Sequence, residues 1–491
     1  MLFLTKIIDS NIKLQKSFDS KVKVSGIATD SREIRKGMIF AVIRGNKNNG
    51  KQYIKDAYKS GAKALLCERE HLKDIKTEVK NILVSKNIRL SVAVIAKKFY
   101  PKQPANISVV TGTNGKTSIV NFLYEIWKKN HIRGACFGTL GIKYDGKNKK
   151  TKLTTLDAIR LHKELNFIKS KKINFAAMEA SSHALDQFRL DKVYVKFALF
   201  TNLSRDHLDY HQNMKKYFLS KIRLFKFILD KKGTAIINTD NRYGKKIKNI
   251  CDIENIKNIT YGFKKDSDWR ITKVKREGKL TKVVFSKENI VYNFFCNLIA
   301  DYEVENLIGA IIIANLNGMS LEKILKNIKS IKKPSGRLKK ISKKNVRLSI
   351  FIDYAHTPEA LEKSLKALKS VYDFKGNLIL VFGCGGERDK GKRKFMGIVA
   401  DNFADKVFIT DDNPRYENAK NIRKEIASAC KKAVCIPNRE TAISRAINIM
   451  QENDILLIAG KGHEKYQEIK GSKIPFDDEV VVKEAINRKL A

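Results

Sequence analysis

The chain has 491 residues, 43% of them hydrophobic, which is enough for about three domains that each bury a core. It contains 7 Pro and no apolar run of about 18 residues, which excludes a collagen-like chain and a membrane-spanning helix. Its 7 Cys form no C-x-x-C pair, so we expect reduced thiols and a cytoplasmic location rather than disulfides or a zinc site.

The chain is strongly basic, with 98 Lys and Arg against 51 Asp and Glu and a net charge of +47. Such an excess is typical of nucleic-acid-binding proteins. Here it is mainly Lys, spread from Lys6 to Lys489, and no RNP, zinc-finger or basic-zipper pattern accompanies it. We therefore expect a solvated Lys-rich surface and no specific nucleic-acid partner. A weak affinity for polyanions and specific nucleic-acid recognition are the alternatives, and the charge would also suit an anionic small-molecule substrate.

Two breaks divide the chain, at residues 101–104 and 332–337, where proline and glycine disfavour helix. They predict domains at 1–103, 104–334 and 335–491. Short apolar runs alternate with amphipathic stretches in each part, which predicts βαβ units and an α/β fold with mostly parallel sheets. In chain order, strands are predicted at 38–43, 64–67, 107–110, 175–177, 197–200, 235–237, 348–352, 378–382, 406–409 and 455–458. The Lys-rich run 147–152 is interpreted as a solvated loop.

The most specific motif is TGTNGKTS at 111–118, between a predicted strand and a predicted helix at 119–129. Glycines let backbone N–H groups face an anion, and the helix N-terminus adds the positive end of its dipole. Lys116 would reach the terminal phosphates of a nucleotide, and Thr117 would bind Mg²⁺ through its hydroxyl. The full Walker spacing needs Gly where the chain has Val110. The alternative is an ordinary glycine turn that opens a helix.

Acidic and imidazole side chains follow two further predicted strands, in EASSH at 179–183 and NLSRDHLDYH at 202–211. Ligands of an open α/β sheet collect outside the carboxyl ends of its strands. Glu179 and His207 are therefore candidates for binding a second cation near Lys116. For His183 and His211 a structural role is an equally good interpretation.

These segments resemble the central domain of the Mur ligases, the ATP-dependent enzymes that build the peptidoglycan stem peptide. Later segments resemble the members that add the third residue: DYAHTP at 353–358, FGCGGERDKGKR at 382–393, DNPR at 412–415 and GKGHE at 460–464. With TDSR at 29–32, the resemblance covers nearly the whole chain. It implies a small UDP-binding N-terminal α/β domain, a central P-loop ATPase-like domain and a C-terminal Rossmann-like domain that binds the incoming amino acid.

The resemblance also implies the reaction and its cofactors. A monomer would use ATP and Mg²⁺ to join meso-2,6-diaminopimelate to the D-Glu of UDP-N-acetylmuramoyl-L-alanyl-D-glutamate, through an acyl phosphate, without inserting into a membrane. Folylpolyglutamate synthetases share the short phosphate loop and are the nearest alternative. A basic P-loop ATPase stimulated by nucleic acid is the alternative from another class.

Four sets of site residues follow from the resemblance. For ATP they are Gly112, Thr113, Asn114, Gly115, Lys116, Thr117, Ser118, Asn306, Arg337 and Asp353. For the UDP-linked dipeptide they are Thr29, Ser31, Asn46, Lys47, Asn48, Thr154, Thr155, Ser181, Gln187 and Arg189. For diaminopimelate they are Arg388, Asp412, Asn413, Pro414, Arg415, Gly460 and Glu464. For metal they are Thr117, Glu179, His207 and Lys221 as a carbamate, and the catalytic set is Lys116, Lys221 and His207.

For Lys221 and Arg415, the local sequence also bears on the role that the resemblance implies. Lys221 would be one more solvated lysine in a Lys-rich helix, and the resemblance reverses that interpretation. Arg415 is suited to the extra carboxylate that distinguishes diaminopimelate from lysine, because a guanidinium pairs bidentately with a carboxylate. The chain departs from the family at Leu153, where a polar contact is expected to be lost, and in the turn at 300–303.

Overall fold

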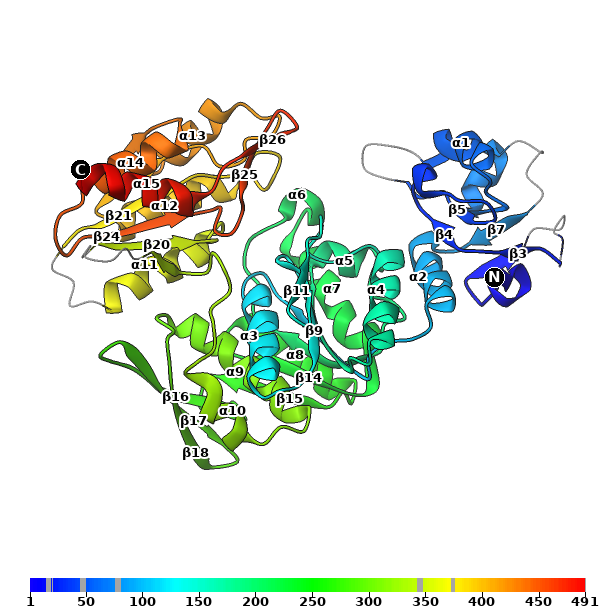
Figure 1. Cartoon of the computed structure of the whole chain (residues 1–491), viewed down its shortest axis with the longest axis horizontal. Coiled ribbons are helices and arrows are strands. Elements are labelled where there is room, and N and C mark those ends of the chain that lie inside the picture. The colour runs from blue at the N-terminus through cyan, green and yellow to red at the C-terminus, as the bar shows by residue number, and fades with distance from the viewer. Residues whose placement is uncertain are drawn as a thin grey trace.

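The computed structural model describes residues 1–14, 19, 21–44, 50–75, 81–341, 348–371 and 376–490. Within these residues, three main sheets follow one another along the chain, each covered by helices (Figure 1). Most strand pairs inside them are parallel, which confirms the predicted α/β class. The predicted domain limits fall in segments without helix or strand, at 101–104 and 331–334, and stay predictions.

The first sheet has the strand order β2-β7-β6-β5-β4, with β2 antiparallel to its neighbour. Its strands are β2 (Ile12–Leu14), β4 (Ile27–Ala28), β5 (Ile39–Ala41), β6 (Ala64–Glu68) and β7 (Ile82–Ser85). The other elements here are β1 (Leu2–Phe3), η1 (Leu4–Lys6), β3 (Lys23–Val24), η2 (Ser31–Glu33), η3 (Gly50–Tyr53), α1 (Ile54–Lys59), η4 (Arg69–Asp74) and α2 (Ile88–Phe99). The strand predicted at 38–43 is shorter than expected because Met38 N–H closes a turn onto Arg35 O.

The central sheet has the order β11-β10-β9-β12-β8-β13-β14-β15-β16-β17-β18, parallel in the middle and antiparallel at both ends. Its strands are β8 (Asn106–Thr111), β9 (Gly134–Gly138), β10 (Gly141–Tyr144), β11 (Lys147–Lys149), β12 (Phe175–Ala180), β13 (Val195–Phe200), β14 (Leu229–Asn238), β15 (Asn258–Gly262), β16 (Trp269–Glu277), β17 (Leu280–Lys287) and β18 (Ile290–Cys296). Its helices are α3 (Lys116–Lys129), α4 (Ala158–Ser170), α5 (Ser182–Asp186), α6 (Leu208–His211), α7 (Met214–Arg223), the π-helical turn η5 (Leu224–Ile228), α8 (Arg242–Ile253), α9 (Asp301–Leu316) and α10 (Leu321–Ile328).

Helix α9 explains how the altered turn at 300–303 is stabilised. Its apolar run fills the core between α3 and the sheet, so the helix must begin at a fixed place. The Glu303 carboxylate accepts the N–H groups of Ile299 and Ala300, at 2.8 and 3.2 Å, and pairs with Lys333 at 3.0 Å. The chain therefore keeps an ordered N-terminus on α9 despite its departure from the family.

The last sheet has the order β19-β20-β24-β21-β22-β23, parallel except for β19. Its strands are β19 (Lys339–Ile341), β20 (Ser349–Asp353), β21 (Leu378–Phe382), β22 (Lys406–Ile409), β23 (Ala433–Cys435) and β24 (Ile455–Ala459), with a separate hairpin of β25 (Tyr466–Ile469) and β26 (Ser472–Pro475). Its helices are α11 (Pro358–Val371), α12 (Lys392–Phe403), α13 (Ala419–Ala427), α14 (Arg439–Asn448) and α15 (Asp478–Leu490).

The interpretation of 147–152 as a loop is wrong for its first three residues. They form the exposed edge strand β11, paired with β10 through a turn at Asp145 and Gly146, which have φ of +44° and +76°. An Asp-Gly pair favours this tight hairpin turn, and that signal was available in the sequence. No helix within the described ranges is long and apolar enough to cross a membrane.

Candidate active site

The motif at 111–118 forms a tight loop between the end of β8 and the start of α3. Gly112 and Gly115 have φ of +150° and +92°, where a side chain would be strained. A Cβ at Gly112 would lie 1.8 Å from Thr201 Oγ1, and one at Gly115 would lie 2.4 Å from Asn306 Oδ1. The glycines are thus required by close neighbours. Asn306 lies against the loop, and its role in nucleotide binding stays a prediction.

Two lysine amines lie against the same carbonyl of this loop. Lys116 Nζ donates to Gly112 O and to Thr113 O, both at 2.8 Å, and Lys221 Nζ donates to Gly112 O at 2.9 Å. Burial lowers the pKa of both amines, that of Lys221 well below its usual value, and their mutual repulsion lowers the pKa of Lys221 further. Lys221 is only 1% exposed, so the interpretation of a solvated lysine is wrong.

Side-chain oxygens that could bind a metal ion lie beside the first turn of α3. Thr117 Oγ1 donates to Glu179 Oε2 at 2.9 Å, and Thr139 donates to the same carboxylate through its N–H at 2.8 Å. Arg337, from the last part of the chain, donates to Thr117 Oγ1 at 3.2 Å. Hydroxyl and carboxylate oxygens are the ligands that Mg²⁺ prefers, so this pair fits a magnesium site.

Three histidines form a cluster next to Lys221. The rings of His183 and His207 lie 4.9 Å apart, those of His183 and His211 5.5 Å apart, and His211 stacks on Tyr217 at 5.0 Å. Burial lowers the pKa of His183 and His211 to about 4 and that of His207 to about 3, so all three are neutral near pH 7. His207 Nδ1 is buried and has no hydrogen-bond partner among the described residues, as a metal-binding nitrogen requires.

The predicted dipeptide residues of the central part converge beside Glu179. Thr155 Oγ1 donates to Glu179 O at 2.8 Å and accepts the Ser181 N–H at 3.1 Å. Arg189 Nη1 donates to Thr155 O at 3.0 Å, and its Nη2 donates to Gln187 Oε1 at 2.6 Å. These contacts bring residues from three segments to one face of the sheet.

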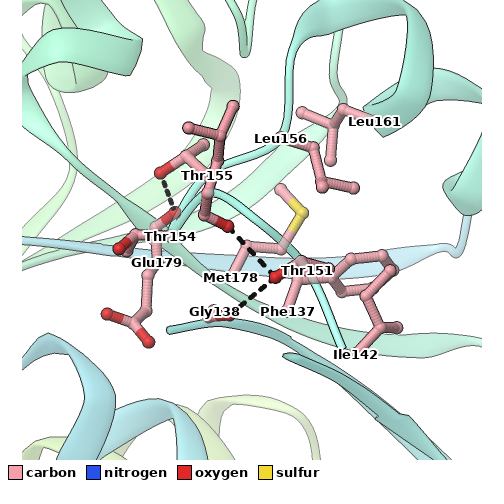
Figure 2. Close-up of a pocket in the computed structure, with 11 residues that line it drawn as sticks. Phe137, Gly138, Ile142, Thr151, Thr154, Thr155, Leu156, Leu161, Met178 and Glu179 are labelled. Carbon is pink, nitrogen blue, oxygen red and sulfur yellow. Dashed lines mark hydrogen bonds between the residues drawn. The ribbon is translucent and has the colours of Figure 1, made fainter. Parts of the chain in front are cut away.

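A small cavity adjoins these residues, and Thr154, Thr155 and Glu179 are part of its lining. Figure 2 shows Thr154, Thr155 and Glu179 on one side and the apolar residues Leu156, Leu161, Phe137 and Ile142 on the other. Thr154 Oγ1 lies 3.1 Å from Thr139 Oγ1. Thr139 in turn donates its N–H to the Glu179 carboxylate, so it connects Thr154 to that carboxylate. Leu153, where the family often has Asn, lines the cavity and is 42% exposed. The expected loss of a polar contact at Leu153 stays a prediction.

Of the residues predicted to contact the UDP group in the first part of the chain, the structure describes only some. Thr29 follows β4 and Ser31 opens η2, where Asp30 accepts the Arg32 N–H at 3.0 Å and also pairs with its guanidinium. Asn46, Lys47 and Asn48 lie outside the described residues. The first part of the chain contacts the central part where α2 packs on α4 and through an ion pair between Arg160 and Glu33.

The segments at 412–415 and 460–464 also meet. Asn413 Nδ2 donates to Glu464 Oε2 at 2.8 Å, and Lys461 Nζ donates to Asn413 Oδ1 at 3.1 Å. Gly460 has φ of +109°, and a Cβ there would lie 2.6 Å from Asp412 Oδ2. The residues predicted for the amino acid therefore form one polar cluster at the carboxyl ends of β22 and β24.

Arg415 and Arg388 both lie near Gly385, where a Cβ would be 3.0 Å from Arg415 Nη1 and 3.9 Å from Arg388 Cγ. Arg415 Nε donates to Glu468 Oε2 at 3.1 Å and its Nη1 donates to Gly386 O at 2.6 Å, so part of the fork is already bound. Burial is the main cause of the lowered pKa of His183, and the positive charge of Arg388 lowers it further. Arg388 is therefore close enough to influence the histidine cluster. The role of Arg415 in specificity stays a prediction.

Asp353 is buried, and its carboxylate accepts hydrogen bonds from neighbouring residues of the same part of the chain. It accepts the N–H groups of Leu338 and Tyr354, at 3.2 and 2.8 Å, and the Ser364 hydroxyl at 2.6 Å. Burial raises its pKa. In this structure Asp353 fixes the segment that carries Arg337, so its predicted contact with the nucleotide stays a prediction.

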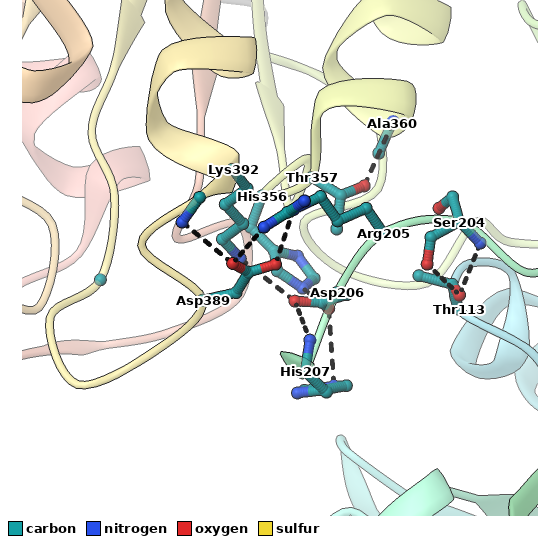
Figure 3. Close-up of polar contacts among 12 residues, drawn as sticks. Thr113, Ser204, Arg205, Asp206, His207, His356, Thr357, Ala360, Asp389 and Lys392 are labelled. Carbon is teal, nitrogen blue, oxygen red and sulfur yellow. Dashed lines mark hydrogen bonds and ion pairs between the residues drawn. The ribbon is translucent and has the colours of Figure 1, made fainter. Parts of the chain in front are cut away.

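Sequence reasoning assigned no role to five residues that join the central and last parts of the chain: Arg205, Asp206, His356, Asp389 and Lys392 (Figure 3). All five lie inside segments that carry the family resemblance. Their signal was the presence of charged residues of opposite sign in two segments, 205–206 and 389–392, but nothing in the sequence pairs those segments.

The fold and site are those of a nucleotide-dependent ligase built from three α/β parts. Three family models match the chain: Mur ligase family, catalytic domain, at 23–100; Mur ligase middle domain at 110–314; and Mur ligase, glutamate ligase domain, at 336–462. The chain therefore belongs to the Mur ligase family.

The chain is similar to the UDP-N-acetylmuramoyl-L-alanyl-D-glutamate–2,6-diaminopimelate ligase of Rickettsia montanensis. The two are 38% identical over 94% of this chain and 96% of that protein. The ligase of the same name from Chelativorans sp. (strain BNC1) is 36% identical over 98% of both chains. A solved structure of a ligase of that name has a TM-score of 0.70 and 30% identity, covering 100% of this chain and 99% of the other. A folylpolyglutamate synthase from Mycobacterium tuberculosis, at 15% identity and a TM-score of 0.63, shares the fold.

Proposed function

We propose that the protein is an ATP-dependent ligase that joins meso-2,6-diaminopimelate to the D-Glu of UDP-N-acetylmuramoyl-L-alanyl-D-glutamate. The near-full-length identity with relatives of that name supports this substrate pair. The reaction belongs to the supply of peptidoglycan precursors in the cytoplasm, and we expect a monomer without a specific nucleic-acid partner.

The observation that carries the proposal is the convergence of Lys116 and Lys221 on Gly112 O beside the Thr117–Glu179 pair. Two amines and a carboxylate around one glycine loop fit the terminal phosphates of a nucleotide and their counter-ions. The dipeptide residues lie on the Glu179 side of this loop. Arg337 reaches it from the last part of the chain, which carries the amino-acid cluster.

The proposed chemistry has two steps. An oxygen of the D-Glu side-chain carboxylate attacks the γ-phosphorus of ATP, ADP leaves, and an acyl phosphate results. The neutral amine of diaminopimelate then attacks the acyl carbon, phosphate leaves with the former carboxylate oxygen, and the amine loses a proton. Lys116 stabilises the charge on the transferring phosphoryl oxygens, and the loop N–H groups orient them.

Mg²⁺ would be held by Thr117 and Glu179, with His207 and a carbamate of Lys221 at a second position, where it would neutralise phosphate charge. The Lys221 amine is suited to carbamate formation because burial favours its neutral form. A neutral amine adds to CO₂ and releases one proton, which turns a cation into an anion at the loop. Lys116, His207 and carbamylated Lys221 are thus the catalytic set of the proposal.

The test is phosphate release from ATP with a panel of carboxylate donors and amines. We expect release only when UDP-N-acetylmuramoyl-L-alanyl-D-glutamate and diaminopimelate are both present. Release with a folate and glutamate would favour the folylpolyglutamate alternative, whose fold this chain shares. ATP turnover that depends on nucleic acid, with steeply salt-dependent binding, would favour the third candidate.

A further inference from the structure

Two consecutive residues of the central part pair with two residues of the last part. The loop after β13 carries Arg205 and Asp206, and the segment leading into α12 carries Asp389 and Lys392. Arg205 pairs with Asp389 at 3.1 Å and Asp206 pairs with Lys392 at 3.3 Å (Figure 3). The signs are opposite in the two pairs, so each segment offers one cation and one anion to the other.

The Arg205–Asp389 pair is bidentate. Arg205 Nε lies 3.1 Å from Asp389 Oδ2 and its Nη2 lies 3.2 Å from Oδ1. The Asp389 side chain is 4% exposed and also accepts the Gly391 N–H at 3.0 Å. A Cβ at Gly391 would lie 2.0 Å from Arg205 Nη2, so a larger residue there would force the guanidinium to shift. Two parallel bonds fix orientation as well as distance.

The Asp206–Lys392 pair is buried and has further partners. The two side chains are 5% and 6% exposed. His356 Nε2 and His207 Nε2 each lie 3.5 Å from Asp206 Oδ2. Joining the two parts removes Asp206 and Lys392 from water, and only their pairing offsets that desolvation cost, so the two charges must meet when the parts come together.

Asp206 also fixes the backbone of the next residue. Its Oδ1 accepts the His207 N–H at 3.0 Å, and His207 has φ of +54°, a conformation that is strained for histidine. A strained residue persists only where its surroundings determine it. The position of His207 therefore depends on the pairs that hold Asp206.

Other contacts bring the same two parts together at the phosphate loop. Asn114 Nδ2 lies 3.4 Å from Thr357 Oγ1, and Arg337 donates to Thr117. Thr357 follows His356 directly, and Arg388 precedes Asp389 directly. The paired residues are therefore adjacent in sequence both to a residue that lies against the nucleotide loop, Thr357, and to the predicted amino-acid residue Arg388.

We propose that Arg205, Asp206, Asp389 and Lys392 form an interdomain clamp that holds the last part of the chain over the phosphate loop and positions His207 and Arg388. These four are positioning residues, since they act through their neighbours. The effect on the reaction rests on the proposed function, while closure of the two parts does not.

The test is a double-mutant cycle on Arg205→Ala and Asp389→Ala, with Arg205→Lys as the conservative variant. Arg133→Ala is the matched control, because Arg133 makes a bidentate pair with Asp145 inside the central part. The readouts are kcat/KM for the ligase reaction and amide hydrogen exchange of peptides covering 204–208 and 386–393 in the free protein. Binding of the UDP-linked dipeptide is measured by calorimetry.

We expect each alanine variant to lower kcat/KM roughly ten- to a hundredfold, since a charge-assisted bond is lost. The double variant should fall no more than about threefold below the worse single variant, because both remove one interaction. Arg205→Lys should recover part of the loss, exchange should accelerate in both peptides, and dipeptide binding should be unchanged. The control should match the wild type throughout.

Losses that multiply in the double variant, or single variants within about twofold of the wild type, would overturn the clamp. Unchanged exchange at 204–208 and 386–393 would do so even if activity falls. If the wild type is inactive with the two proposed substrates, the proposed function is wrong. Hydrogen exchange of the same variants would still show whether the clamp holds the two parts together.

Discussion

The amines of Lys116 and Lys221 donate to one carbonyl, Gly112 O, at 2.8 and 2.9 Å. The two residues come from the start of α3 and the last turn of α7, more than a hundred positions apart. Two cations this close repel each other, so burial and mutual repulsion together favour the neutral form of Lys221. Converting one of the amines into a carbamate would replace that repulsion with attraction.

Lys221→Met is expected to reduce the ligase rate by roughly a hundredfold or more, the usual cost of losing a group that stabilises transition-state charge. The variant keeps the side-chain volume at a buried position, so the fold should be kept, as circular dichroism would show. Lys226→Met is the matched control, because Lys226 pairs with Glu254 on the surface one turn away. Removing bicarbonate should slow the wild type, and short carboxylates should partly restore Lys221→Ala. A fully active Lys221→Met enzyme would disprove the role.

Lys116→Ala is expected to abolish ATP turnover, because it removes the amine proposed to stabilise the charge on the transferring phosphoryl oxygens. Binding of the UDP-linked dipeptide should be nearly unaffected, since its predicted uridine contacts Thr29 and Ser31 lie in the first part of the chain. Calorimetry with the dipeptide in the absence of ATP measures this. Loss of dipeptide binding would argue against separate sites.

Arg415→Ala is expected to lower kcat/KM for meso-diaminopimelate roughly ten- to a hundredfold, the value of one charge-assisted pair. Any trace rate with L-lysine should stay the same, because lysine lacks the second carboxylate. Arg415→Lys should recover little, since a point charge cannot reproduce the fork that also contacts Glu468 and Gly386. If Arg415→Ala still strongly prefers diaminopimelate, the specificity comes from other residues.

Glu417→Gln is expected to destabilise the last part of the chain in a pH-dependent way. Glu417 accepts two bonds from buried Arg393, at 2.9 and 2.7 Å, and these bonds lower its pKa to about 2. A lowered folded-state pKa contributes stability above the unfolded value of 4.5, and this stability is lost as the pH falls from 4.5 toward 2. Urea unfolding should show a difference of about 1.5–3 kcal/mol at pH 7 that shrinks toward pH 3. A difference independent of pH would contradict the ionic cause.

The sequence predicted what local pattern determines. The strand and helix around 111–118 and the parallel strands at 378–382 and 406–409 are confirmed, because apolar runs and glycine positions encode them locally. The local pattern does not indicate the burial of Lys221, since a lysine in a Lys-rich helix looks solvated until the fold brings it to Gly112, and only the family resemblance assigned it a role. The pairing of 205–206 with 389–392 was missed because it joins loops of two sheets, and charge alone does not specify a partner.

Oxygen transfer from the carboxylate donor to the released phosphate distinguishes the acyl-phosphate reaction from simple hydrolysis of ATP. UDP-N-acetylmuramoyl-L-alanyl-D-glutamate labelled with ¹⁸O in the D-Glu side-chain carboxylate is incubated with ATP, Mg²⁺ and meso-diaminopimelate, and the phosphate is analysed by mass spectrometry. We predict one ¹⁸O atom in each phosphate released, together with an amide product that contains diaminopimelate. Unlabelled phosphate, or phosphate release without the amide product, would exclude ligation through an acyl phosphate.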